Sequence, residues 1–115
     1  MYKRQIQPQE GVIGTPYYMS PEQADGRDTD ERSDLYAVGI MLYEMLMGKK
    51  PYVGDSPNAI LDRHRSDPIP ELPKKLRELQ PMLDRLLAKE PEQRIGSARQ
   101  LAETIESLRA RLQAA

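Results

Sequence analysis

Apolar and polar residues follow one another along this chain in blocks whose lengths and periods are helical. The longest apolar block is 35–47, in which Glu44 is the only charged residue. Its apolar positions lie around most of a helical circumference, so the pattern predicts a central helix that is buried on nearly all sides. Gly48 and Pro51 are expected to end this helix. It is shorter than the roughly 20 residues that cross a bilayer.

Capping residues and proline place the elements around this central helix. Ser56 and Pro57 predict the start of a helix, and the three prolines of 67–73 predict an extended stretch after it. The lone histidine, His64, is expected on the surface of that helix.

Two amphipathic helices complete the pattern. The first is predicted to start near Pro81 and to run to about Lys89, and its apolar positions are Leu79, Met82, Leu83, Leu86 and Leu87. The second follows a predicted capping box of Ser97 and Gln100 and presents one apolar face, made of Leu101, Ile105, Leu108 and Leu112. No strand or internal repeat is evident, so the predicted fold class is all-α.

The polar segments and the composition narrow the possible functions. Residues 1–12 are polar and are expected to form a loop or frayed strand, and 23–34 is expected to be a hydrophilic surface loop. At 115 residues and a net charge of -1, the chain is one domain or part of one, with no indication of a nucleic-acid partner. It has no cysteine, no signal peptide and no membrane segment, so we expect a cytoplasmic location.

The segment 14–22, Gly-Thr-Pro-Tyr-Tyr-Met-Ser-Pro-Glu, has the densest local signals. Gly14 and Pro16 shape a turn, and Ser20 is expected to cap a short helix with Pro21 first and Gln23 at its third position. Such a shaped loop is more often functional than merely connective. The hydroxyl of Thr15 is either a structural turn group or part of a substrate site.

Three motifs in this chain resemble those of serine/threonine protein kinases, in their bacterial form. They are the Gly-Thr-x-x-Tyr-x-Ser-Pro-Glu run of 14–22, Ser-Asp-Leu-Tyr-Ala-Val-Gly at 33–39, and Lys-Glu-Pro-Glu-Gln-Arg at 89–94. The resemblance implies the C-terminal helical subdomain of the kinase fold. Residues 1–22 would then be the end of the activation segment, and 23–115 would be the helical remainder of the large lobe.

The same resemblance implies a role for particular residues. Gly14, Thr15, Pro16, Tyr17 and Tyr18 would position the protein substrate. Glu22 and Arg94 would form a buried structural ion pair, and Asp34 would anchor the catalytic loop.

The resemblance to kinases assigns no catalytic residue and no metal ligand to this chain. It has no glycine-rich loop of the G-x-G-x-x-G type and, lacking phenylalanine, no D-F-G. His64 to Asp67 does not match the H-R-D loop, because Asp67 comes one place late and no asparagine follows it. We therefore expect ATP and Mg²⁺ only in the intact parent, and no activity from this chain alone.

Met1 is interpreted as an internal methionine of that parent. A split gene, a mis-assigned start and a degraded copy are the open alternatives.

Two functions remain open on the sequence. The first is a fragment of a serine/threonine kinase whose partners are the protein substrate and the missing N-terminal portion. The alternative is a catalytically silent helical interaction module that meets a partner or self-associates through Leu42, Met45 and Met47 of an uncovered central helix.

Overall fold

The computed structural model describes residues 16–114, and Gly14 and Thr15 lie outside them. The described elements are η1 (Pro16–Tyr18), α3 (Pro21–Ala24), α4 (Glu31–Met47), α5 (Pro57–Ser66), η2 (Lys74–Leu79), α6 (Gln80–Leu86), η3 (Pro91–Gln93) and α7 (Ala98–Ala114). Elements marked η are 3₁₀ turns. This part of the chain contains no strand, so the all-α prediction is confirmed for it.

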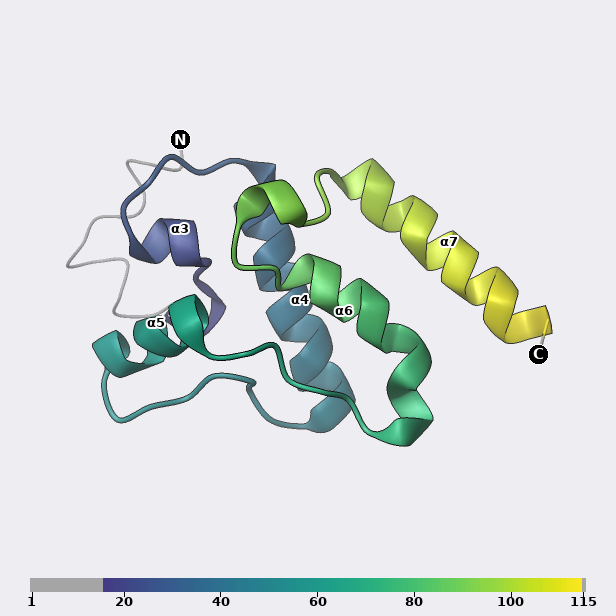
Figure 1. The fold of residues 1–115 in the computed structure, drawn as a ribbon, viewed down its shortest axis with the longest axis horizontal. Coiled ribbons are helices and arrows are strands. Elements are labelled where there is room, and N and C mark those ends of the chain that lie inside the picture. Colours follow the sequence, from purple (N-terminus) through teal and green to yellow (C-terminus); the bar gives the residue numbers. More distant parts are fainter. Residues whose placement is uncertain (1–15, 115) are drawn as a thin grey trace.

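Helix α4 is the element on which the others pack (Figure 1). Helix α6 packs on one side of α4, and η1 packs on the other side. Helix α5 in turn contacts η1 and α3. Helix α7 extends away from this body towards the C-terminus. None of the helices in 16–114 is long and apolar enough to span a membrane.

Local capping signals correctly predicted several element ends. Ser20 and Gln23 form a reciprocal capping box at α3, in which the Ser20 amide donates to Gln23 Oε1 over 2.9 Å. Gly48 ends α4 with a φ of 74°, a left-handed angle that glycine adopts without a side-chain clash. Ser56 caps α5 by accepting from the Ala59 amide.

Other boundaries differ from the prediction. Helix α4 begins at Glu31 because the Asp30 side chain caps it, so the predicted loop 23–34 overlaps α4 by four residues and α3 by two. Helix α6 ends at Leu86, before Lys89, and η2 precedes it. The predicted box at α7 is half formed, since Gln100 Oε1 accepts from the Gly96 amide rather than from Ser97.

The core consists of two apolar clusters that meet between α4 and α6. Their buried members are Tyr36, Ile40, Tyr43, Tyr52, Leu72, Leu83 and Leu87 in one, and Leu35, Met82, Leu86, Ile95 and Leu108 in the other. The prediction that α4 is buried on nearly all sides is wrong. Met41 is 44% exposed and Met45 is 79% exposed, because no described element packs against that side of the helix.

Gly39 is the point of closest approach between α4 and α6. A Cβ atom placed on it would lie 2.8 Å from Leu86 Cβ and 2.8 Å from Leu87 Cδ2. We expect Gly39→Ala to lower the free energy of unfolding by about 1–2 kcal/mol, because the clash outweighs the gain in helix propensity. Urea denaturation of both proteins tests this, with the exposed helical substitution Ser107→Ala as control. Greater stability of Gly39→Ala would show that α6 can move away at no cost.

Candidate functional site

A buried ion pair between Glu22 and Arg94 connects α3 to the segment that precedes α7. Arg94 Nη1 lies 2.7 Å from Glu22 Oε2 and its Nη2 lies 3.0 Å from Oε1, so the contact is bidentate. The side chains of Arg94 and Glu22 are 0% and 3% exposed. Ser33 Oγ donates to the same Glu22 oxygen over 2.7 Å.

The remaining donors of Arg94 are used on backbone carbonyls. Its Nε donates to the Ala88 carbonyl over 3.0 Å, and Nη1 also donates to the Arg32 carbonyl over 2.9 Å. Burial alone would raise the pKa of Glu22, but the hydrogen bonds from Arg94 and Ser33 outweigh it and lower the pKa to about 2. Glu22 is therefore ionised at neutral pH. The pair connects residues 72 positions apart, and it fixes α3 against α4 and the turn after α6.

The predicted substrate-positioning residues that lie within the structure form η1. Pro16 is buried, and Tyr17 and Tyr18 are half-buried. The Tyr18 hydroxyl donates to Glu44 Oε1 over 2.7 Å, and Glu44 Oε2 accepts from Lys50 Nζ over 3.1 Å. Lys50 Nζ also lies 5.0 Å from the centre of the Tyr17 ring, a cation–π distance.

These contacts lower the pKa of Glu44 and raise the pKa values of Tyr18 and Lys50. The hydrogen bond from Tyr18 is the main cause that lowers the pKa of Glu44, and the same bond raises the pKa of Tyr18. The hydrogen bond to Glu44 likewise raises the pKa of Lys50. The network holds η1 on the C-terminal half of α4. Sequence reasoning did not assign Glu44 to the site, although its isolation in an apolar block was a usable signal.

His64 is buried, with 0% of its surface exposed, so its predicted surface position is wrong. Its Nδ1 lies 2.7 Å from the Tyr36 hydroxyl, and its ring meets the Tyr52 ring edge-on at 4.9 Å between centres. Lys89 Nζ donates to the His64 carbonyl over 2.8 Å and to the Tyr52 hydroxyl over 3.1 Å. Ile60, Leu61 and His64 share one face of α5, which was the signal for burial.

Burial is also the main reason why the pKa of His64 falls to about 4, with the charge of Lys89 as the second cause. The backbone of Pro16 and Tyr17 opposes that fall only in part. Nε2 makes no well-directed hydrogen bond to any described residue. His64 is thus a neutral packing group that connects α5, α4 and η1.

Asp34 stands apart from these contacts. It lies in the first turn of α4, exposed to solvent, and within 16–114 it has neither an ion-pair nor a hydrogen-bond partner. Asp34, Val38, Met41 and Met45 follow one another at helical spacing along one side of α4. We call this row the α4 stripe.

The described residues contain no group of three or more His, Asp or Glu side chains that could hold a metal ion. The arrangement of residues 16–114 does not match the donor set that Mg²⁺ and the phosphates of ATP require. The Glu22–Arg94 pair and the Tyr18–Glu44–Lys50 network instead have a structural effect: they fix η1 and α3 in position on α4.

Comparison with known proteins shows what the chain resembles. The serine/threonine-protein kinase PknB of Mycolicibacterium smegmatis is 44% identical over 95 residues, which are 78% of this chain and 15% of that protein. PknB of Mycobacterium leprae is 45% identical over 96 residues, again 78% of this chain and 15% of the relative. PksC of Streptomyces coelicolor is 44% identical over 109 residues, 90% of this chain and 19% of the relative.

The chain therefore spans less than a fifth of the length of these relatives. The family model described as the protein kinase domain matches residues 2–105, which include all three motifs. That match covers most of the 115 residues. The predicted resemblance is confirmed, and this chain belongs to the protein kinase family.

Proposed function

We propose that this chain is the substrate-positioning loop and helical scaffold of the large lobe of a serine/threonine protein kinase. In the intact parent, phosphate would pass from ATP to a serine or threonine of a protein. The observation that carries the proposal is the buried Glu22–Arg94 pair, because it gives η1 and α3 a fixed position on the helices. Residues 1–22 would end the activation segment, and 23–115 would complete the lobe.

Each site residue receives a proposed role. Gly14 and Thr15, with Pro16, Tyr17 and Tyr18, would shape the surface that receives the protein substrate. Glu22 and Arg94 would hold the scaffold without taking part in the chemistry. The carboxylate of Asp34 would hydrogen-bond the catalytic loop supplied by the upstream part of the kinase domain. Its exposure and its place on the α4 stripe support this role.

The α4 stripe is the proposed docking face for that upstream part. Met41 and Met45 are 44% and 79% exposed on neighbouring turns of this stripe, and adjoining exposed apolar side chains support a docking role. ATP and Mg²⁺ would be bound by the partner portion, since the described residues lack the donors. A cytoplasmic location is also proposed, and the absence of cysteine supports it.

The direct test measures phosphate transfer from radiolabelled ATP with Mg²⁺ to a generic protein substrate. We expect no incorporation by the 115-residue chain above its Glu22→Ala variant. Mixing with the upstream kinase-domain portion of the Mycolicibacterium smegmatis relative is expected to restore activity. Asp34→Asn is expected to reduce the restored rate about ten- to hundredfold, the worth of a charged hydrogen bond.

Two results would contradict the proposal. Activity of the chain alone would show that the catalytic groups are present within it. No binding to the upstream portion, with the chain folded as judged by circular dichroism, would remove the α4 stripe as a docking face.

The alternative is a silent helical module that self-associates or binds another protein. One observation favours it, the exposure of Met41 and Met45, whereas Leu42 and Met47 are partly buried against the core. Sedimentation velocity separates the two functions. A monodisperse monomer that melts cooperatively counts against self-association through α4.

A further inference from the structure

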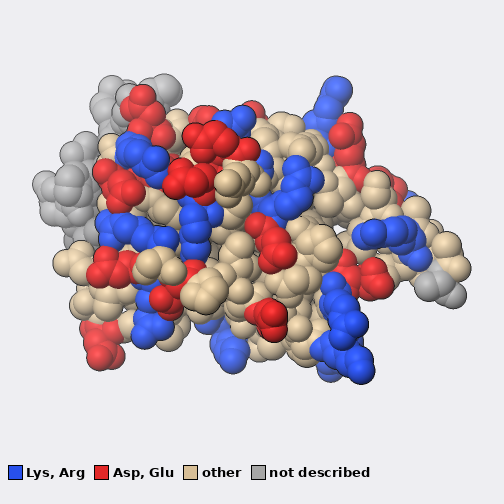
Figure 2. Space-filling view, in the orientation of Figure 1, with Lys and Arg blue, Asp and Glu red and all other residues tan. Residues whose placement is uncertain are grey.

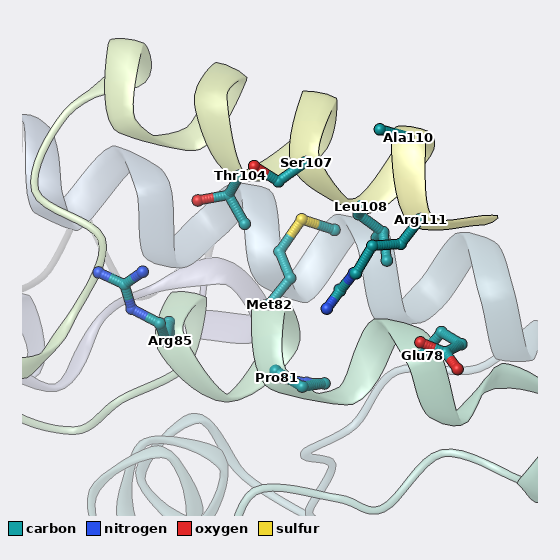
Figure 3. Close-up of a pocket in the computed structure, with 9 residues that line it drawn as sticks. All are labelled: Glu78, Pro81, Met82, Arg85, Thr104, Ser107, Leu108, Ala110 and Arg111. Carbon is teal, nitrogen blue, oxygen red and sulfur yellow. The ribbon is translucent and has the colours of Figure 1, made fainter. Parts of the chain in front are cut away.

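A groove of about 530 Å³ runs between α6 and α7. Figure 3 shows that Met82 rises from α6 into the middle of it, while Leu108 and Arg111 descend from α7. Arg85 and Glu78 stand at opposite ends. The other lining residues are Pro81, Thr104, Ser107 and Ala110.

The groove is open because α7 is held against the body mainly through two of its apolar residues. Leu108 is buried against the second core cluster, and Leu101 packs at the edge of the same cluster. Ile105 and Leu112, from the same predicted face, remain 43% and 49% exposed. Neither side chain lines the groove, so among the described residues the apolar floor is formed by Met82, Leu108, Pro81 and Ala110.

The charged groups around this floor are mostly positive and unneutralised. Arg85 and Arg111 line it against a single acid, Glu78. Lys74, Lys75 and Arg77 of η2, next to Glu78, are exposed. Figure 2 shows lysine and arginine atoms gathered at the corner of the molecule where η2 lies.

None of these five cations has an ion-pair partner in 16–114, whereas Arg63, Arg65 and Arg109 on other surfaces do. An apolar floor with an excess of free cations favours an occupant with apolar anchors and acidic flanks.

We propose that the α6–α7 groove docks an acidic amphipathic helix of a partner protein. The apolar side of the partner helix would lie over Met82, Leu108 and Pro81. Its carboxylates would pair with Arg85 and Arg111 along the rims. This surface is separate from the α4 stripe and does not depend on the proposed kinase role.

The test uses the full chain and a fluorescein-labelled helical peptide with leucine at every third or fourth position and glutamate elsewhere. A second peptide carries lysine in place of each glutamate. Fluorescence anisotropy is expected to show saturable binding of the acidic peptide only, weakening as salt is raised.

Two variants and one control locate the binding. Arg85→Glu with Arg111→Glu is expected to weaken binding about tenfold or more, since each reversal removes an attraction and adds a repulsion. Ala110→Trp, which fills the groove from an exposed position, is expected to abolish it. Arg99→Glu is the matched control, because Arg99 is an exposed cation of α7 that does not line the groove; its affinity is expected to stay within about twofold. Circular dichroism checks that each variant folds.

The proposal is overturned if the two peptides bind equally well or if neither binds. It is also overturned if Arg99→Glu weakens the affinity for the acidic peptide as much as the double arginine variant does. A dimer that Ala110→Trp dissociates would assign the groove to a second copy of this chain and would also overturn it.

Discussion

Replacing Glu22 with alanine is expected to lower the free energy of unfolding by about 3–5 kcal/mol, the cost of leaving one charge of a buried pair without its partner. Arg94 is 0% exposed, so removing the carboxylate would leave its charge buried without a counter-ion. Urea denaturation of the chain at neutral pH measures the loss. The matched control is Glu106→Ala, which breaks the exposed pair with Arg109 and is expected to cost less than about 1 kcal/mol.

Ser33→Ala provides a milder test if Glu22→Ala does not fold. It removes the 2.7 Å hydrogen bond to Glu22 Oε2 and is expected to cost about 1.5–3 kcal/mol, the range for a bond to a charged group. A loss below about 1 kcal/mol for Glu22→Ala would mean that water reaches Arg94, and the pair would then no longer explain how α3 is held.

The same pair gives the chain a dependence on acid. The pKa of Glu22 falls from 4.5 to about 2 on folding, so the unfolded chain binds this proton first as the pH drops. Stability from the pair is complete above pH 4.5 and is lost as the pH falls towards 2. In Glu22→Ala this part of the acid denaturation is expected to disappear.

Features decided by three or four neighbouring residues were predictable from the sequence. The capping box of Ser20 and Gln23 and the left-handed Gly48 depend only on their own turns, and both lie where the pattern placed them. The all-α class followed from the same local periodicity. The contact between Glu22 and Arg94, in contrast, came from resemblance to a family, because no local pattern connects residues 72 positions apart.

Features decided by distant residues were missed. His64 was placed on the surface although it shares one face of α5 with Ile60 and Leu61, because no local pattern indicates partners that lie far away in the sequence. Its burial depends on Tyr36, 28 positions earlier, and on the Tyr52 ring. The exposure of one side of α4, at Met41 and Met45, was missed for a related reason. An apolar helix indicates that it needs covering, but which side is covered depends on the other elements.

His64 is expected to make the chain less stable by about 2 kcal/mol at pH 5 than at pH 7, because its pKa falls from 6.5 to about 4 on folding. Between these two values the unfolded chain binds a proton that the folded chain excludes. Stability is therefore complete above pH 6.5 and decreases as the pH falls towards 4. The charge of Lys89 helps to lower the pKa of His64, and burial lowers the pKa of Lys89 only to about 8, so Lys89 stays mostly charged in this window. It therefore opposes protonation of His64 throughout.

Tyr36, Tyr52 and Glu22 do not titrate between pH 7 and pH 5. Burial raises the pKa values of Tyr36 and Tyr52 far above this range, and the pKa of Glu22 lies well below it. His64→Asn is the informative variant, because an amide at this position can still hydrogen-bond the Tyr36 hydroxyl but takes up no proton. Urea denaturation at several pH values measures the effect. We expect the slope of stability against pH to be largely lost in His64→Asn, and an unchanged slope would mean that His64 is already open to solvent in the folded chain.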